Sequence, residues 1–539
     1  MLYVPATSYD KDLKIWSGDE IKEYFAPNLS IGEIIFHEMR RHPKLIAQIS
    51  TTEETILTRE ELHSNAMHVA SYMRSRGLLQ SDIVGIIARN TTHIPAVAYG
   101  CFFNGIAFHS LNIAYDRGTI EKLFSITRPR IIFCDGDEYE KVREATQHLE
   151  NVEIATMRNH PEGGSTPIQQ ILSSPIEDNF LPVRLEQGID QTLAILCSSG
   201  TTGTPKAVTL TNSRKILAGC HSLTTSDVQY TYSSLDWISG VLTTITSGVY
   251  STTRIITDNV YDPVYLLRLI EDRKITWTLQ APSHMAMMVN CPEFESTDFS
   301  SIRYFLFGGG RASVETQKLI RSRLSRDGLI FMYGLTELGA MATMNVHFDE
   351  KPNSVGRLLS GLKAKIVSEE GESLDPDELG EVCIRNGQHW AGYYGNQQET
   401  RKIRDPQLWF HTGDLGYMDY DGFLYIVERK KDMLKYLGMM YYPNDIETII
   451  SEMPEVAEVC VFGVWDQVNG DEAVAAVVKR QGKELKAQDI VDYVRDHTEV
   501  KYKQLNGGAI IMEELKRSPN GKTNRIATKE YFLNIKGRQ

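Results

Sequence analysis

Residues Leu193–Val208 read LAILCSSGTTGTPKAV, a short apolar run followed by a loop rich in Ser, Thr and Gly. The run Leu193–Cys197 has the length and polar flanks of a buried strand. The loop adds two glycines, which let backbone N–H groups converge on an anion, and one lysine, which adds positive charge. We therefore predict a phosphate-binding loop directly after a strand. A flexible linker of similar composition would need neither the strand nor the Pro-Lys pair.

The spacing of the loop differs from the Walker motif, which requires Gly-x4-Gly-Lys-Ser/Thr. Here Lys206 is followed by Ala207, so the residue that would bind Mg²⁺ is missing. The loop instead resembles the signature of the acyl-adenylate-forming (AMP-binding) enzymes, which include acyl-CoA synthetases, 4-coumarate-CoA ligases and firefly luciferase. This resemblance implies that the loop binds the β- and γ-phosphates of ATP. The matching residues are Ser198, Ser199, Gly200, Thr201, Thr202, Gly203, Thr204 and Lys206.

The composition is that of a globular protein with more than one domain. The chain has 539 residues, of which 42% are hydrophobic and 24% charged. Its 57 basic and 70 acidic residues give a net charge of −13, which argues against a general nucleic-acid binder. The seven cysteines are scattered without a C-x-x-C pair, so we expect neither a zinc site nor a disulfide framework, and we expect a reducing compartment.

The termini and the most apolar stretch carry no targeting or membrane signal. The first residues lack the apolar core of a secretory signal. Residues Ile94–Phe108 are too short and too interrupted for a membrane span, and they predict a buried helix running into a strand. The chain ends in Lys536-Gly537-Arg538-Gln539 rather than in the peroxisomal Ser-Lys-Leu. We expect an intracellular, cytoplasmic protein without a transmembrane segment.

Strands and helices alternate on both sides of the predicted phosphate loop. This alternation predicts an α/β fold, with a large N-terminal domain of doubly wound, mostly parallel sheets and helices on both faces. Ligands in such sheets bind at the carboxyl ends of the strands. The predicted strands are Val84–Ala88, Ile131–Cys134, Arg254–Thr257, Ile275–Leu279, Ile302–Phe307 and Leu329–Met332, and the predicted helices are Glu60–Arg76, Pro263–Asp272 and Val314–Leu324.

Two further loops follow predicted strands. Gly308, Gly309 and Gly310 allow a flat ligand to approach the backbone, and in the resembling family this segment lines the adenine pocket. A tight turn would explain one or two of these glycines equally well. The second loop is Tyr333-Gly334-Leu335-Thr336-Glu337, which offers a stacking ring, a hydroxyl and a hard oxygen ligand for Mg²⁺. The family's Tyr-Gly-x-Thr-Glu motif assigns these groups to adenine, phosphate and metal; the plain alternative is a helix start capped by Thr336.

Asp414 follows Thr412-Gly413 at the base of a predicted hairpin, whose turn is Asp421-Gly422. A surface carboxylate at this place would be unremarkable by itself. In the resembling family, however, this aspartate accepts hydrogen bonds from both ribose hydroxyls of ATP. A carboxylate suits that role because its two oxygens can accept two O–H groups at once.

The charged stretch Glu428–Gly438 has the composition of a solvated linker. The resemblance places a domain border here, between a large AMP-binding domain of residues 1–430 and a small, mobile α+β domain of residues 431–539. It also assigns Arg429 to the ribose of ATP and Lys431 to the hinge.

Two lysines of the predicted C-terminal domain match family motifs. Lys435 and Gly438 match a loop that approaches the active site for thioester formation. Lys522 lies in Ser518-Pro519-Asn520-Gly521-Lys522, where Asn520 replaces the usual threonine. In the family this lysine contacts the acyl carboxylate and the α-phosphate. A lysine in an exposed Asn-Gly turn is otherwise commonplace.

The resemblance covers nearly the whole chain and implies a two-step reaction with ATP, Mg²⁺ and coenzyme A. A carboxylic acid attacks the α-phosphate to give acyl-AMP and pyrophosphate, and a thiol then displaces AMP. The first step needs Lys522 in the site and the second needs it withdrawn, which a hinged domain permits. Trp237 stands where luciferase has the second residue of a His-His pair, and we predict that it gates the acyl pocket. Core packing is the alternative for this tryptophan.

Three classes of function remain open at this stage. The favoured one is an acid–thiol ligase, specifically a fatty acyl-CoA synthetase, whose partners are a small-molecule carboxylic acid, ATP and coenzyme A. The second is a 4-coumarate-CoA ligase-like or luciferase-like adenylating enzyme; Trp237 and Met440 differ from the luciferase residues. The third is a nucleotide-binding relative without activity, which the presence of Lys206, Glu337 and Asp414 argues against.

Overall fold

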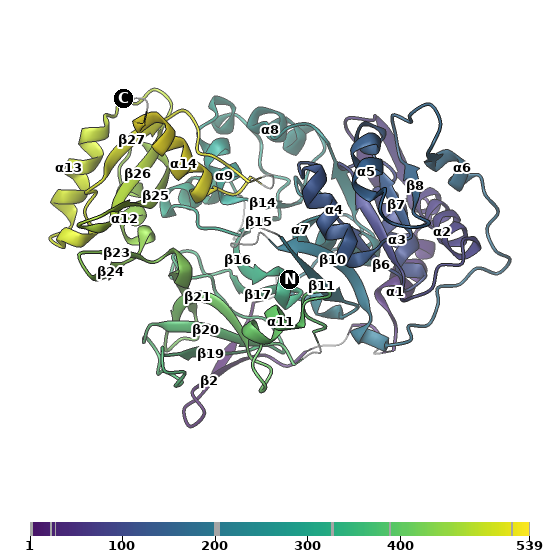
Figure 1. The fold of residues 1–539 in the computed structure, drawn as a ribbon, viewed down its shortest axis with the longest axis horizontal. Coiled ribbons are helices and arrows are strands. Elements are labelled where there is room, and N and C mark those ends of the chain that lie inside the picture. The colour runs from purple at the N-terminus through teal and green to yellow at the C-terminus, as the bar shows by residue number, and fades with distance from the viewer. Residues whose placement is uncertain are drawn as a thin grey trace.

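Four β-sheets with their packed helices make up the described part of the chain (Figure 1). The computed structural model describes residues 4–21, 24–26, 28–198, 205–324, 328–387, 390–518 and 521–537. The predicted phosphate-loop residues Ser199, Gly200, Thr201, Thr202, Gly203 and Thr204 lie outside these ranges. No helix within them combines the length and apolar character that crossing a membrane requires.

The first sheet has seven strands in the order β11-β10-β6-β5-β7-β8-β9, all parallel except β11. Its central strands are buried on both faces, as the apolar run IVGII of β5 predicts. The strands are β5 (Ile83–Ile87), β6 (Ala107–Ser110), β7 (Ile131–Cys134), β8 (Glu153–Thr156), β9 (Thr166–Pro167), β10 (Thr192–Ser198) and β11 (Lys206–Thr211).

The second sheet has nine strands in the order β18-β17-β16-β15-β14-β12-β13-β3-β4. The strands from β16 to β3 run parallel, and β4, β17 and β18 are antiparallel additions. Their bounds are β3 (Ile46–Ser50), β4 (Thr55–Thr58), β12 (Val228–Thr231), β13 (Thr253–Ile256), β14 (Trp277–Gln280), β15 (Tyr304–Gly308), β16 (Leu329–Leu335), β17 (Ala340–Asn345) and β18 (Arg357–Leu358).

Helices pack between and around these two sheets, which confirms the predicted mostly parallel α/β architecture. α1, α3 and α7 contact one another between the sheets, and every residue of α3 is buried. α8 spans the residues predicted from sequence. The helices are α1 (Ile31–Arg41), α2 (Arg59–Ser75), α3 (Ile94–Phe103), α4 (Arg117–Thr127), α5 (Tyr139–Thr146), α6 (Ile168–Leu172), α7 (Ile238–Tyr250), α8 (Pro263–Asp272), α9 (Pro282–Val289), α10 (Val314–Arg323) and α11 (Gln397–Ile403).

The predicted loop beginning at Tyr333 is in part a strand. β16 continues through Leu335, because β17 pairs with it antiparallel and Tyr333 lies opposite Thr343. Only after Leu335 does the chain turn, through a short 3-10 helix at Thr336–Leu338. The prediction that the strand ends at Met332 was therefore wrong, since the pairing partner comes from a later segment that the local pattern does not reveal.

The third sheet is antiparallel, in the order β1-β2-β19-β20-β21-β22, and it was not predicted as a separate sheet. The N-terminal hairpin joins it through pairing of β2 with β19, and Trp16 of β2 is only 1% exposed. The predicted hairpin around Asp421-Gly422 forms its last two strands. The strands are β1 (Thr7–Asp10), β2 (Ile15–Gly18), β19 (Lys363–Val367), β20 (Gly380–Arg385), β21 (Phe410–Met418) and β22 (Leu424–Arg429).

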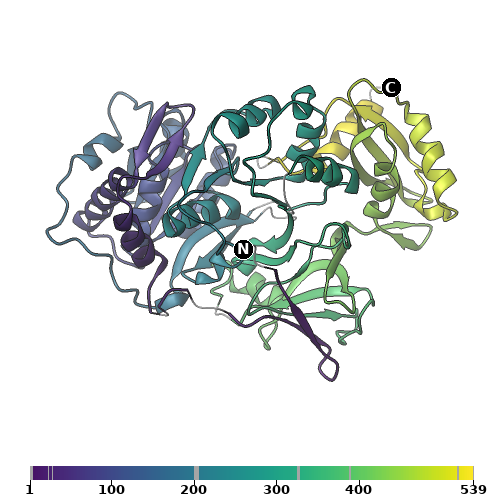
Figure 2. The same cartoon turned by 180° about the vertical axis from the view of Figure 1, so that it is seen from behind.

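The last part of the chain, which we name the C-terminal unit (residues 434–536), folds around its own five-stranded sheet and lies beside the rest of the protein (Figure 2). We name the three preceding sheets with their helices the N-terminal unit (residues 7–429). The C-terminal unit has its own buried core, which includes Ile446, Val461 and Ile490. Its elements are β23 (Leu434–Tyr436), β24 (Met439–Tyr441), α12 (Pro443–Ser451), β25 (Val456–Asp466), β26 (Gly470–Lys479), α13 (Ala487–His497), β27 (Gly508–Met512) and α14 (Arg525–Lys536).

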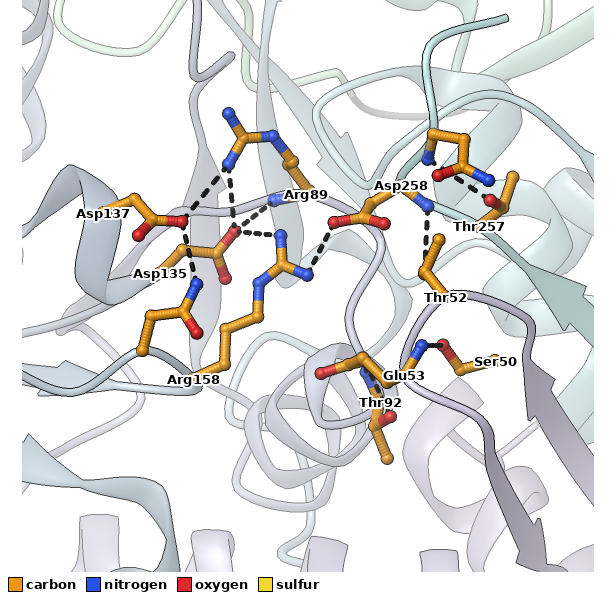
Figure 3. Close-up of polar contacts among 12 residues, drawn as sticks. Ser50, Thr52, Glu53, Arg89, Thr92, Asp135, Asp137, Arg158, Thr257 and Asp258 are labelled. Carbon is orange, nitrogen blue, oxygen red and sulfur yellow. Dashed lines mark hydrogen bonds and ion pairs between the residues drawn. The ribbon is translucent and has the colours of Figure 1, made fainter. Parts of the chain in front are cut away.

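A charged network joins the two large sheets where their strands end (Figure 3). Arg158, after β8, pairs with Asp135 after β7 at 3.1 Å and with Asp258 after β13 at 2.6 Å. The Asp135 side chain is fully buried, and burial raises its pKa against the opposing effect of Arg158. Such a buried pair is costly to break, because one charge would remain without a partner. The network therefore fixes the two sheets relative to each other.

Candidate active site

A cavity of about 1480 Å³ lies between the carboxyl ends of the nine-stranded sheet, the antiparallel sheet and the C-terminal unit. Its position agrees with the rule that ligands bind outside the carboxyl ends of parallel strands. The predicted site residues that line it are Ser198, Lys206, Trp237, Gly308, Gly309, Gly310, Tyr333, Gly334, Thr336, Glu337, Asp414, Arg429 and Lys522.

Asp414, at the base of the hairpin, is buried and contacts two polar side chains. The Tyr333 hydroxyl donates to Asp414 Oδ2 at 2.6 Å, and Arg429 Nε lies 2.9 Å from Asp414 Oδ1. Burial raises the pKa of Asp414, and the neighbouring Arg429 opposes that shift. Burial and the Asp414 carboxylate raise the pKa of Tyr333 well above its ordinary value, so Tyr333 stays a hydrogen-bond donor. Each Asp414 oxygen retains a further lone pair for another donor.

Glu337 and Lys206 both contact Tyr393, a residue that the sequence analysis did not identify as part of the site. The Tyr393 hydroxyl donates to Glu337 Oε1 at 2.9 Å, and Lys206 Nζ lies 5.0 Å from the centre of the Tyr393 ring. Lys206 also forms a 2.6 Å ion pair with Glu399 of α11. Hydrogen bonds from Lys206 and Lys402 lower the pKa of Glu399 to about 2. These contacts hold Lys206 at the cavity wall.

Two of the three glycines at the end of β15, Gly308 and Gly309, lie in close contact with other residues. A Cβ at Gly308 would lie 2.6 Å from the Met332 carbonyl oxygen. Gly309 has a φ of +82°, and a Cβ there would lie 2.5 Å from Lys522 Cε and 2.8 Å from Lys522 Nζ. The side chain of Lys522 therefore lies directly over the backbone of Gly309, and a larger residue would displace it.

Lys522 of the C-terminal unit lines the cavity near Arg429 and Asp414. It is exposed to the cavity but surrounded by protein, and this loss of hydration lowers its pKa to about 8. The nearby Arg429 cation lowers the pKa further, and Asp414 opposes the shift. The amino group therefore remains largely protonated at neutral pH.

Lys435 and Gly438 lie apart from the residues that line the cavity. Lys435 is exposed on β23, and its backbone N–H donates to Asp471 at 3.1 Å. Gly438 forms the hairpin turn to β24 with a φ of +83°. Lys431 lies between the two units in a short 3-10 helix, Lys430–Asp432, and burial lowers its pKa. The structure thus brings Lys522 to the cavity and leaves Lys435 and Gly438 outside.

Comparison with known proteins decides the family. The profile of the AMP-binding enzyme family matches residues 35–394, and that of the AMP-binding enzyme C-terminal domain matches residues 445–522. The chain is an AMP-binding enzyme. It belongs to the acyl-adenylate-forming proteins.

Several relatives align with almost the whole of this AMP-binding enzyme. Luciferin 4-monooxygenase of Photuris pensylvanica is 27% identical, over 93% of this chain and 95% of its own length. 4-coumarate–CoA ligase CCL1 of Humulus lupulus is 25% identical, over 94% of both chains. The solved anthranilate CoA ligase AuaEII in complex with anthranoyl-AMP shares the fold, with a TM-score of 0.84 at 19% identity, over 94% of this chain and 98% of its own.

One wall of the cavity in this AMP-binding enzyme is apolar. Trp237, half-buried at the start of α7, lies on this wall. His284 of α9 stacks on Tyr261 with ring centres 3.7 Å apart, and burial lowers its pKa to about 3, so it is neutral at pH 7. The wall offers aliphatic and aromatic surface rather than charge. Its other apolar residues are Ile216, Ile238, Leu242, Leu279 and Met341.

The donor set around Glu337 suits Mg²⁺ held jointly with ATP phosphates. Mg²⁺ prefers one or two carboxylates together with phosphate oxygens and water. Glu337 offers a carboxylate in the cavity, and Tyr393 orients it. Within the described residues, no group of three or more His, Cys, Asp or Glu side chains suits a protein-only metal site. The cation would therefore depend on the nucleotide for most of its ligands.

Proposed function

We propose that the protein is an ATP-dependent acid–thiol ligase. It would adenylate a carboxylic acid, releasing pyrophosphate, and then transfer the acyl group to coenzyme A. The observation that carries this proposal is the position of Lys522, which reaches from the C-terminal unit across to Gly309, near Arg429 and Asp414. A cation at that place can neutralise an anionic centre formed between the two units.

The adenylation step joins two anions, so charge neutralisation is its main requirement. We assign Asp414 and Arg429 to the ribose, Tyr333, Gly334 and the glycines Gly308–Gly310 to the adenine, and Lys206 to the phosphates. Lys522 would hold the acyl carboxylate against the α-phosphate. The carboxylate oxygen forms the new P–O bond, and the bond to pyrophosphate breaks. Mg²⁺, held by Glu337 and the phosphates, would supply further positive charge, and Thr336 would donate its hydroxyl to phosphate.

Thioester formation needs different residues of the protein next to the acyl-AMP. The thiol sulfur attacks the acyl carbon, and AMP leaves with the bonding electron pair. We propose that residues 431–539 move as a domain against residues 1–430, with Lys431 at the hinge. This motion would withdraw Lys522 and bring Lys435 and Gly438 to the coenzyme A thiol.

The apolar wall of the cavity indicates the kind of acyl substrate. The apolar wall around Trp237 and Leu242 favours an acid with an uncharged hydrocarbon part. We propose a fatty acid, with Trp237 as the gate of its pocket. An aryl acid, as the name of the Humulus relative suggests, is the competing choice.

A substrate screen tests both levels of this proposal. The protein is incubated with ATP, Mg²⁺ and a panel of fatty and aryl acids, and pyrophosphate, AMP and thioester are measured with and without coenzyme A. Pyrophosphate release that depends on an acid, followed by thioester only with coenzyme A, supports the ligase. Turnover of aryl acids alone would reject the fatty acid, and the lack of any acid-dependent AMP release would reject the ligase.

A further inference from the structure

Lys522 is fixed from its N-terminal side by a contact between the two units. The Ser283 hydroxyl of α9 donates to the carbonyl oxygen of Gly521 at 2.5 Å. Gly521 has a φ of +81°, and a Cβ there would lie 2.4 Å from His284 Nε2. The backbone directly before Lys522 therefore rests against the first turn of α9. Only glycine permits this close approach in that conformation.

A second contact between the units fixes the chain just after Lys522. Arg525, the first residue of α14, lies 3.4 Å from Glu428 of β22 and 3.0 Å from Glu447 of α12. Glu428 belongs to the N-terminal unit and Glu447 to the C-terminal unit, so one guanidinium links both. The Glu428 side chain is only 9% exposed, and the Asn444 backbone N–H also donates to it at 3.3 Å.

We propose that Ser283 and Glu428 are positioning residues that hold Lys522 in the cavity for adenylation. This inference rests on the proposed ligase function. Lysine has a flexible four-carbon stem, so its amino group is placed well only if the backbone that carries it is fixed. Ser283 holds the residue before Lys522, and Glu428 holds the residue three positions after it. The two contacts act from different elements of the N-terminal unit on one short segment.

Both contacts join the two units. Their loss should therefore affect adenylation and thioester formation to different extents. They exist in the arrangement that presents Lys522, and both must break when the C-terminal unit turns to present Lys435. Weakening them should therefore slow adenylation while leaving thioester formation unchanged or faster. A residue that merely stabilises the fold would lower both half-reactions together.

The test compares half-reactions in four variants. Ser283→Ala removes the hydroxyl and Ser283→Thr keeps it. Glu428→Gln removes the charge that faces Arg525. Asp375→Asn is the matched control, because it breaks an ion pair with Lys14 that lies wholly within the N-terminal unit. Single-turnover assays follow pyrophosphate release from ATP and acid, and thioester formation from preformed acyl-AMP with coenzyme A.

We expect Ser283→Ala and Glu428→Gln each to slow adenylation by about 10-fold, the scale of one lost interaction with a polar or charged partner. Thioester formation should stay within about twofold of the unmodified protein or rise. Ser283→Thr should adenylate at close to the unmodified rate, and Asp375→Asn should change the rate of neither half-reaction. Equal losses in both half-reactions, or no loss in adenylation, would overturn the proposal.

A readout independent of catalysis separates this inference from the ligase proposal. Amide hydrogen exchange of the full-length protein with ATP alone should be faster in the peptide that contains Lys522 for Ser283→Ala and Glu428→Gln, but not for Asp375→Asn. Unchanged exchange in that peptide would overturn the positioning role. Faster exchange in a protein that adenylates no acid would uphold the contacts and reject the ligase instead.

Discussion

Two lysines of the C-terminal unit, Lys522 and Lys435, carry the same chemical group at different places in the structure. Lys522 lines the cavity, lies over Gly309 and has a pKa lowered to about 8. Lys435 stands exposed on β23, beside a hairpin turn and away from the cavity. The difference indicates that one arrangement of the two units can present only one of these cations to a substrate. Each lysine is therefore expected to serve its own half-reaction.

Removal of Lys522 should have the largest effect on activity, and the effect should fall on adenylation. Lys522→Ala should slow adenylation by about 10²–10³-fold, as when one charge-stabilising donor is lost from an active site. The variant should still convert preformed acyl-AMP and coenzyme A to thioester, since that step does not use Lys522. Single-turnover assays of each half-reaction measure both rates. Similar losses in both steps would contradict the division of labour.

Removal of Lys435 should affect the other half-reaction, thioester formation, by a smaller factor. Lys435→Ala should leave adenylation near the unmodified rate, because Lys435 lies outside the cavity, and should slow thioester formation by about 10–10²-fold. Acyl-AMP should then accumulate when ATP, acid and coenzyme A are all present. A variant that forms thioester at the normal rate would assign Lys435 to the surface alone.

Glu337 should affect adenylation independently of both lysines, because we expect it to act on the nucleotide and its metal. Glu337→Gln should slow adenylation about 10-fold or more, since the neutral amide binds Mg²⁺ poorly. Conversion of preformed acyl-AMP to thioester should change little. Activity should also vanish in excess chelator and return with Mg²⁺. Full adenylation in chelator would reject a role for the metal.

The pH dependence should distinguish the two lysines by a smaller effect. Lys522 is active as a cation, and its pKa of about 8 in the free protein means that the cation is present below that pH and is lost above it. We expect kcat/KM for adenylation to fall to about half near pH 8, and thioester formation from acyl-AMP to show no decline there. A profile of adenylation that stays flat to pH 10 would show that the lysine keeps its proton in the site.

Limited digestion should leave the two lysines together. Trypsin should cut at Arg429–Lys431, because exposed links between domains are the usual sites of nicking. The products should be a large N-terminal piece and a fragment of residues 431–539 that carries both lysines. First cleavage near residue 200 would show that the border lies elsewhere. Gel electrophoresis with mass spectrometry of the fragments decides between these outcomes.

Local sequence patterns predicted those elements whose signals lie within the elements themselves. The helix at Pro263–Asp272 has the predicted bounds, because apolar spacing and end signals are local. The continuation of β16 through Tyr333 was missed, because it depends on β17. The N-terminal hairpin was missed as part of a sheet for the same reason: its partner β19 lies far along the chain.

The site residues likewise divide into those that a local motif marks and those whose role depends on distant segments. Motif residues such as Asp414 and Lys522 were found because a family pattern marks them. Tyr393 and Glu399 were missed as partners of Glu337 and Lys206, because these pairs form across long sequence separations. The doublet Tyr393-Tyr394 after Gly392 was the one available signal. The contacts that flank Lys522, from Ser283 and Glu428, carry no local signal at all.

The N-terminal hairpin has a consequence for the order in which the protein is made. Tyr9 of β1 bonds to Asp375, a residue 366 positions further along the chain. At ordinary rates of synthesis this partner emerges roughly 20–70 s after the hairpin. During that interval the side of β2 that later pairs with β19 is an unprotected strand edge, and Trp16 has no sheet to cover it. The antiparallel sheet is therefore completed late in synthesis. In a variant without the first twenty residues, β19 would be an unpaired edge strand.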